Sequence, residues 1–197
     1  MILRMTKPKL KPLFPKIILK SERLTLRPPA ITDQAQWTET RTRNKTHIQP
    51  YEPTWSPHYT KADFWHARLN RQSREWELGL ANAFLIFKDE TLIGGMPINN
   101  ICRGAAQFAS IGYWIDQSHE GQGLMSEAIA LTLNYAFKTL ALHRINASCI
   151  PQNPRSKNTL LRAGFVEEGF AEKYLRINGK WQDHHLFGLN IDDWGKI

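Results

Sequence analysis

Residues 111–128 read IGYWIDQSHEGQGLMSEA, an apolar run that ends in a turn with Gly121 and Gly123 and leads directly into a helical segment. A strand that feeds a helix through such a turn leaves several backbone N–H groups pointing at one spot. The helix dipole adds positive potential there, so the expected guest is a phosphate. Glycine lets the main chain approach the anion closely. The stretch therefore predicts an anion site at the start of this helix.

Other phosphate and catalytic motifs fit poorly. A dinucleotide fingerprint needs a third glycine at position 126, where this chain has Ser126, and no GxxxxGK[ST] sequence is present. The chain also lacks the G-x-S-x-G elbow of serine hydrolases. Its seven histidines show no metal-ligand spacing, so we expect no metal cofactor.

The segments around this stretch alternate between strand and helix patterns. The predicted order is strand, two helices, three strands, helix, strand, helix and a final hairpin, which indicates an α/β fold with a mixed, mostly antiparallel central sheet flanked by helices. The predicted strands cover residues 22–29, 82–87, 91–101, 107–116, 144–150, 164–177 and 181–190. The predicted helices cover residues 33–44, 60–78, 123–140 and 154–163. Asn178-Gly179 is a hairpin signal, and residues 49–57 hold three prolines and form a loop.

A second motif follows the glycine turn by about thirty residues. Asn153, Ser156, Gly164 and Phe165 occur as N-x-x-S-x-x-x-L-x-x-x-G-F. Together the two motifs resemble the GNAT superfamily of acyl-CoA-dependent N-acetyltransferases. SERLTLRP, QPYEP, GGMPINNICRG, HRINA and NGKWQDH add similarity to the branch of ribosomal-protein-alanine N-acetyltransferases, the RimJ/RimL type, and above all to its RimJ-like members. This resemblance covers about residues 21–190.

The resemblance implies a GNAT fold with splayed central strands and a site for acetyl-CoA as cosubstrate. The residues expected to contact this cofactor are Trp114, Ile115, Glu120, Gly121, Gln122, Gly123, Leu124, Met125, Ser126, Asn153 and Ser156. Backbone N–H groups near Trp114 and Ile115 are the expected oxyanion donors.

This sequence departs from the broader family pattern at two positions. Ser118 stands where the turn often begins with Gln or Arg, so one side-chain contact to phosphate is missing. Leu160 stands where many relatives place a tyrosine that protonates the departing thiolate. The resemblance implies that Ser156, or alternatively water, protonates the thiolate in this chain. It also implies that Asn153 is a catalytic residue. Glu52, Glu172 and Asp183 are the carboxylates to test as the base, Glu52 first.

The acceptor predicted from the resemblance is the N-terminal α-amine of a ribosomal protein that begins with alanine. The QPYEP loop, Asn99, Asn100, Tyr174 and Asp183 are the expected walls of its cleft. An α-amine has an ordinary pKa of about 7.7–8.0 and is easier to deprotonate than a lysine near 10.4. Two alternatives stay open: acetylation of a small amine by the same fold, and a non-catalytic ribosome-associated factor that binds CoA.

Length and charge complete the sequence picture. The length of 197 residues suits one domain, residues 21–197. A Lys/Pro-rich tail, residues 1–20, precedes it and carries six basic and no acidic residues. The net charge of the whole chain is +8. The tail reads as mobile, and either binds ribosomal RNA or only aids solubility. No apolar stretch could span a bilayer or serve as a secretory signal. Cys102 and Cys149 read as buried thiols. We therefore expect a cytoplasmic protein with no membrane contact, whereas the oligomeric state stays open.

Overall fold

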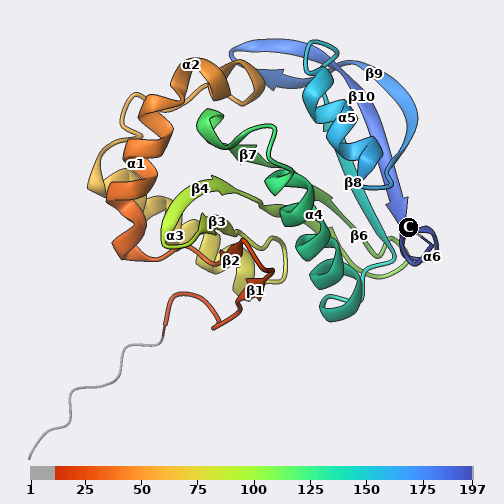
Figure 1. Ribbon diagram of the computed structural model, residues 1–197, viewed down its shortest axis with the longest axis horizontal. Helices are drawn as coiled ribbons and strands as arrows, with labels where there is room; N and C mark the ends of the chain where they lie inside the picture. Colours follow the sequence, from red (N-terminus) through yellow and green to blue (C-terminus); the bar gives the residue numbers. More distant parts are fainter. Residues whose placement is uncertain (1–11, 197) are drawn as a thin grey trace, which may run out of the picture.

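The computed structural model describes residues 12–196, which form two five-stranded sheets flanked by helices (Figure 1). The first sheet has the order β1 (Leu19–Lys20), β2 (Thr25–Arg27), β3 (Leu85–Lys88), β4 (Thr91–Gly95) and β7 (Trp114–Ile115). The second has the order β5 (Ile98–Cys102), β6 (Phe108–Ile111), β8 (Arg144–Cys149), β10 (Lys180–Asn190) and β9 (Val166–Ile177). The helices are α1 (Gln34–Arg43), α2 (Lys45–Ile48), α3 (Ala62–Glu77), α4 (Leu124–Asn134), α5 (Pro154–Arg162) and α6 (Ile191–Trp194). All neighbouring strands pair antiparallel except β6 and β8, so the predicted mixed, mostly antiparallel architecture is confirmed.

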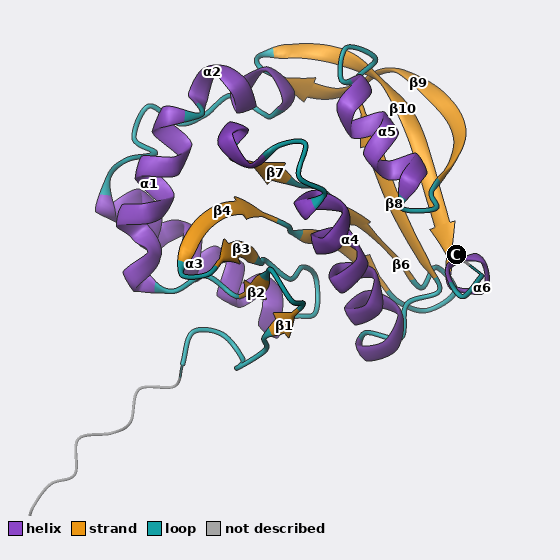
Figure 2. Ribbon diagram, in the orientation of Figure 1, coloured by secondary structure: helices purple, strands orange, loops and turns teal. Residues whose placement is uncertain are grey.

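The first sheet is buried on both faces, as the near-continuous apolar run of β3 requires. Ile86 packs into the core that includes residues of α4, whereas Leu85 and Phe87 pack with Trp37 of α1 and Trp65 of α3. Figure 2 shows α4 and α5 on the near side of the sheets, with α1 and α2 along one side of the molecule. Packing on both faces holds the first sheet in place, and with it the edge of that sheet where the cleft is predicted.

Two predicted strands are each broken in the structure. Residues 91–101 divide into β4 and β5 around Pro97, and residues 107–116 divide into β6 and β7 at Gly112 and Tyr113. Proline lacks the N–H that a central strand needs, which explains the first break. Each broken segment passes from one sheet to the other, so the single central sheet of the prediction is two sheets joined by bent strands.

The breaks also separate β7 from β8. Strand β6 pairs parallel with β8 through Ser110 and Asn146, but β7 pairs only with β4 and ends the first sheet. The strands therefore diverge beyond Ser110, and one edge of β7 carries no strand pairing. Such an unpaired edge leaves backbone groups free for a ligand.

The long predicted helix, residues 123–140, has two parts. Helix α4 ends at Asn134, and a π-helical turn, Tyr135–Thr139, completes the segment. Residues such as Leu124, Ala128 and Leu133 are almost fully buried against the sheets, as the predicted apolar face requires. The helix thereby holds its N-terminal turn rigidly beside β7.

The predicted tail is too long. Leu19–Lys20 pairs with β2, the Phe14 side chain is buried, and the Leu13 carbonyl accepts a hydrogen bond from Ser73 on α3. Phe14 packs edge-on against Trp76. This aromatic contact anchors a segment whose lysines and prolines had indicated mobility. The rest of the predicted tail, residues 1–11, lies outside the described residues.

Across residues 12–196 we find no helix that is both long and apolar enough to cross a membrane. Both cysteines are free thiols; Cys149 is buried and Cys102 is half-buried. Burial raises the pKa of the Cys149 thiol to about 11, which leaves it protonated near neutral pH.

Candidate active site

A cleft of about 1080 Å³ opens where β7 diverges from β8. Its walls come from α2 with the loop that follows it, from Tyr113–Ile115, from the glycine turn and the start of α4, and from one face of α5. This volume exceeds that of most single-ligand pockets, so it has room for an extended ligand and a second reactant.

The glycine turn is built as an anion cradle. Gly121 and Gly123 have φ of +72° and +75°, and Gly123 is the N-cap of α4. An added Cβ at Gly121 would meet no atom within 4 Å, and at Gly123 only Arg23 Nη2 at 3.8 Å. The glycines are therefore required by the left-handed backbone more than by crowding within the protein. Neither glycine adds a side chain that could cover the amides of the turn.

Buried and charged side chains hold the turn from both sides. Arg23 donates to the Gln122 carbonyl at 3.1 Å and pairs with Glu127 on α4. Asp116, at the other end of the turn, accepts hydrogen bonds from Arg43, Asn44 and the Ser118 N–H.

Asp116 stays ionised because its partners outweigh its burial. Burial by itself raises the pKa of Asp116, whereas the hydrogen bonds from Arg43 and Asn44 lower it more strongly, to about 2. A permanently charged carboxylate therefore joins α1 to the glycine turn.

The second motif forms the opposite wall. The Asn153 side chain accepts from the Ser156 N–H at 3.1 Å and caps α5. The Ser156 hydroxyl lies 2.8 Å from the hydroxyl of Tyr113, and both residues line the cleft. Leu160 is fully buried and so offers no polar group to the cleft. Tyr113 and Ser156 therefore form a pair of hydrogen-bonded hydroxyls at the wall of the cleft.

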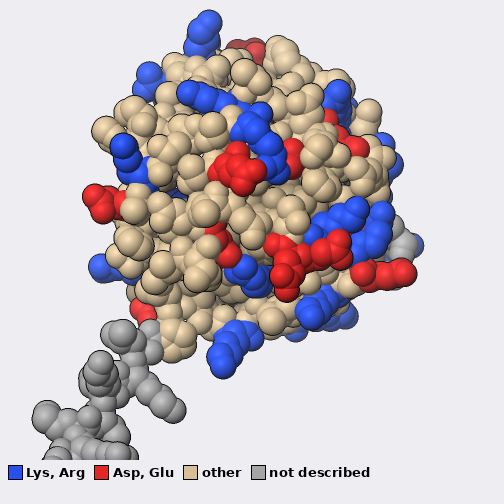
Figure 3. Space-filling view, turned by 60° about the vertical axis from the view of Figure 1, so that its left-hand side comes forward, with Lys and Arg blue, Asp and Glu red and all other residues tan. Residues whose placement is uncertain are grey.

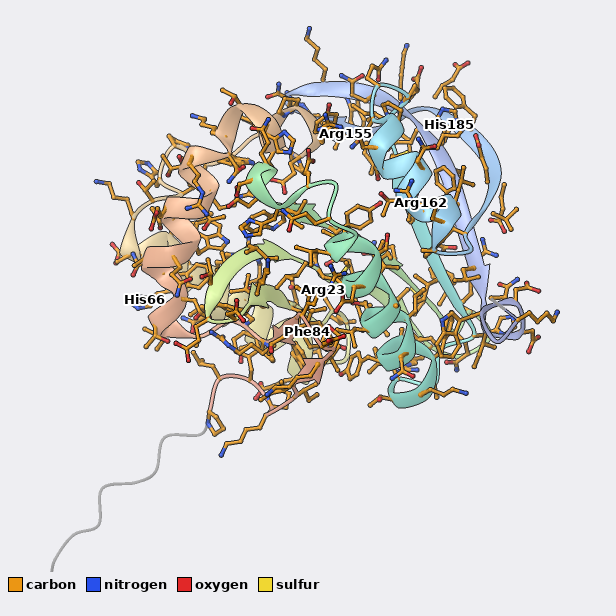
Figure 4. The ribbon with its side chains drawn as sticks, viewed as in Figure 1. Arg23, His66, Phe84, Arg155, Arg162 and His185 are labelled. Carbon is orange, nitrogen blue, oxygen red and sulfur yellow. The ribbon has the colours of Figure 1, made fainter. Side chains whose placement is uncertain are left out.

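A chain of charges crosses from α2 to α5. Glu120, directly before Gly121, accepts from His47 of α2 at 3.0 Å and pairs with Arg155 of α5 at 2.6 Å. Figure 4 shows Arg155 near the N-terminal end of α5 and Arg162 further along the same helix. Both arginines line the cleft on the α5 wall, and Arg155 reaches Glu120 next to the glycine turn.

The third wall carries Glu52. Both of its carboxylate oxygens accept hydrogen bonds from Arg41, and one of them also accepts from Trp55 at 2.8 Å. The Arg41 guanidinium is itself buried and lies over Trp55, with 3.9 Å from its Cζ to the ring centroid. Glu52 is therefore held at the edge of the cleft by its ion pair with Arg41.

Most of the predicted cofactor residues meet in this cleft. The residues that line it are Trp114, Ile115, Glu120, Gly121, Gly123, Leu124, Met125, Ser126, Asn153 and Ser156. Gln122 does not line it: its side chain turns back to the Ser118 carbonyl. Glu52 lines the cleft as predicted, although its role there is a separate question.

The predicted acceptor residues outside the QPYEP loop lie elsewhere. The Asn100 side chain donates to Ser110, and Asp183 accepts from the Lys173 N–H. Tyr174 contacts the His184 ring, and Asn99 is exposed on β5. None of these four residues lines this cleft. The hairpin still touches the loop, because the Asn178 N–H donates to the Glu52 carbonyl.

Sequence reasoning missed Tyr113, His47 and Arg155 as cleft residues. Tyr113 is part of the IGYWID stretch and lies where the strand breaks. A break inside an apolar run has no simple sequence signal, so its position in the cleft could not be predicted. The partners of Glu120 come from α2 and α5, which are distant in sequence. In residues 12–196 no group of three or more His, Cys, Asp or Glu side chains could hold a metal ion.

The geometry suits transfer of an acyl group carried by a phosphorylated cofactor, and comparison with known proteins decides the family. The family described as Acetyltransferase (GNAT) domain matches residues 23–166. The chain belongs to the GNAT acetyltransferase family. It is an acetyl-CoA-dependent N-acetyltransferase.

Individual relatives narrow the branch of the GNAT family. The [Ribosomal protein uS5]-alanine N-acetyltransferase of Escherichia coli (strain K12) is 34% identical over 184 residues, which cover 91% of this chain and 94% of that protein. The crystal structure of the ribosomal-protein-S5-alanine acetyltransferase from Vibrio fischeri superposes with a TM-score of 0.84 at 33% identity, covering 91% of this chain and 99% of that one. Mycobacterium smegmatis RimJ in complex with CoA-disulfide has a TM-score of 0.82 at 32% identity, covering 86% and 82%.

Proposed function

We propose that this GNAT enzyme transfers the acetyl group of acetyl-CoA to the N-terminal α-amine of a ribosomal protein, with alanine as the first residue. The observation that carries the proposal is the similarity, along 91% of the chain, to an enzyme named for that modification of uS5. The size of the cleft supports it, since cofactor and peptide terminus must bind at once.

The charges of the cleft divide it into a donor side and an acceptor side. The turn amides, the α4 dipole, Arg155 and Arg162 give the donor side positive potential, which suits the phosphates of acetyl-CoA. Glu52 lies on the third wall, where its carboxylate is held by Arg41, and we assign it to the acceptor side as a hydrogen-bond acceptor for the amine.

The chemistry requires few groups. A neutral amine attacks the thioester carbonyl, negative charge develops on oxygen, and the thiolate leaves. Backbone N–H groups at the unpaired edge of β7, near Trp114 and Ile115, stabilise the oxyanion. Ser156, held by the Asn153 cap, protonates the sulfur.

Deprotonation of the amine needs no dedicated base. Both Glu52 oxygens already accept hydrogen bonds from Arg41, and one of them also accepts from Trp55. We therefore assign Glu52 to positioning of the acceptor amine and the proton to water. An α-amine with a pKa of about 7.7–8.0 is sufficiently deprotonated near neutral pH, whereas a lysine is not.

The test offers the purified protein acetyl-CoA with four acceptors: an Ala-initiated ribosomal peptide, its Ser-initiated version, its N-terminally blocked version with an internal lysine, and a set of small amines. Tandem mass spectrometry locates the acetyl group. We expect it on the alanine α-amine and not on the blocked peptide. Acetyl groups mainly on lysine, or only on small amines, would contradict the proposed acceptor.

The basic tail suggests a further contact. We propose that it increases the encounter rate with ribosomal RNA without selecting the acceptor. Figure 3 shows basic side chains beside acidic ones over the face in view, so this part of the folded surface offers no continuous basic patch for RNA.

A further inference from the structure

Proton supply to the leaving sulfur involves a second residue. Ser156 has a single hydroxyl proton, and its Oγ lies 2.8 Å from the Tyr113 hydroxyl oxygen. The same tyrosine hydroxyl lies 3.3 Å from the Ser156 carbonyl. Tyr113 and Ser156 come from different elements, the β6–β7 break and α5, and meet at the wall of the cleft.

The surroundings of Tyr113 favour the protonated form of its hydroxyl. Burial raises the pKa of Tyr113 well above its usual value, while the Ser156 hydrogen bond and the positive charge of Arg162 act to lower it. Tyr113 therefore keeps its proton at rest; burial disfavours the phenolate that proton transfer creates, and the charge of Arg162 offsets part of that cost.

We propose that Tyr113 supplies the proton that Ser156 delivers to the sulfur of CoA, so that the two hydroxyls act as one relay. As the C–N bond forms and the C–S bond breaks, its electron pair stays on sulfur. Sulfur takes the Ser156 proton, and Ser156 Oγ takes the proton of Tyr113. The new amide nitrogen releases one proton to water, and Tyr113 recovers one from water, so proton number is conserved.

This relay rests on the proposed function only in that an amine must be acetylated; it requires neither alanine nor a ribosomal protein. Tyr113 acts through Ser156 and is a positioning residue in this scheme. It supplies from another element the phenol that the family pattern places at position 160, where this chain has the buried Leu160.

The experiment measures steady-state rates of Tyr113→Phe, Ser156→Ala and the double variant with whichever amine the wild type acetylates. We expect kcat to fall roughly 10- to 100-fold in Tyr113→Phe, with calorimetric affinity for acetyl-CoA retained. Ser156→Ala falls by roughly 10- to 1000-fold, and the double variant resembles the worse single one, because both remove the same relay. The matched control is Tyr135→Phe, which removes a buried hydroxyl beside Phe84 in the core and leaves kcat unchanged.

A change of leaving group separates proton supply from a structural role. Acetyl-seleno-CoA releases a selenolate, which leaves without protonation because a selenol is a much stronger acid than a thiol. With this donor we expect Tyr113→Phe to approach the wild-type rate. If the defect of Tyr113→Phe is equal with both donors, or if the two single effects multiply in the double variant, the relay is wrong. If only lysines or small amines are acetylated, the proposed acceptor fails while the relay is still tested.

Discussion

At the scale of single residues, Gly123 is the position where we expect the proposed cofactor site to be most sensitive to substitution. Its φ of +75° is unfavourable for any β-branched residue, and its N–H belongs to the turn that meets the anion. We expect Gly123→Val to raise the acetyl-CoA dissociation constant at least tenfold, a loss of about 1.4 kcal/mol. Isothermal titration calorimetry on the folded variant measures this.

The matched control is Gly104→Val. Gly104 has a φ of +70°, an open surrounding, and a position in the β5–β6 turn outside the cleft. Both variants strain the backbone to a similar degree, but only the change at Gly123 should weaken acetyl-CoA binding. Equal affinities in the two variants would remove the turn from cofactor recognition.

Asp116 ties α1 to the glycine turn through its charge. Because its folded-state pKa of about 2 lies below the ordinary 3.8, the ionised group stabilises the fold above about pH 4, and this contribution is lost as the pH falls through about 2. We expect Asp116→Asn to lower the free energy of unfolding by about 1–3 kcal/mol near neutral pH. The deficit should shrink at pH 3, as urea unfolding at both pH values will show.

Glu39→Gln is the control for this effect. Glu39 pairs with the same arginine, Arg43, but its side chain is 75% exposed, so its loss should cost little. A deficit in Asp116→Asn that is independent of pH, or one equal to that of Glu39→Gln, would show that the charge of Asp116 is not what stabilises the turn.

At the scale of elements, β4 and β7 pack closely because β4 has glycine where the two strands meet. A Cβ added at Gly95 would lie 2.5 Å from Nε1 of Trp114, whose ring also faces Arg41 at 4.9 Å. We expect Gly95→Ala to displace this indole and destabilise the fold by about 1–3 kcal/mol. The acetyl-CoA affinity should fall as well, since Trp114 lines the cleft.

Gly169→Ala provides the comparison, because Gly169 of β9 has no atom within 4 Å of an added Cβ. Thermal unfolding and calorimetry of both variants test the prediction. Unchanged stability and affinity in Gly95→Ala would mean that the indole can move without cost to the cleft.

Element types could be predicted from periodicity, but the break at Gly112 and Tyr113 could not. The apolar run of β3, the apolar face of α4 and the Asn178-Gly179 turn all depend on neighbours in the sequence, and all three occur in the structure. The division of residues 107–116 depends instead on pairing with β4 on one side and β8 on the other. Such pairing is a property of the assembled sheets, and therefore Tyr113 was not recognised.

At the scale of the whole molecule, the cleft joins segments that motifs describe separately. The two motifs place most of the expected cofactor residues at the cleft, because each motif is a short contiguous stretch of sequence. Of the expected acceptor residues, Asn99 and Asn100 do not line the cleft, whereas Glu52 does and is placed by Arg41, eleven residues away. Side-chain partners that cross between elements cannot be read from a single sequence.

Part of the N-terminal segment that was predicted as a tail is folded. Phe14 and β1 belong to the folded domain. Deletion of residues 1–20 should therefore destabilise the protein, because truncation of a buried aromatic alone costs about 3–5 kcal/mol. Deletion of residues 1–11, with four of the six basic side chains, should leave both the melting temperature and the activity on a free peptide unchanged.

The two deletions together separate folding from encounter with the ribosome. With ribosomal particles as substrate, we expect the 1–11 deletion to be slower than the full chain at low salt and equal to it at high salt, since charge attraction to RNA is screened. Initial rates at several salt concentrations measure the difference. A deficit that persists at high salt, or that also occurs with the free peptide, would show that residues 1–11 act by something other than their charge.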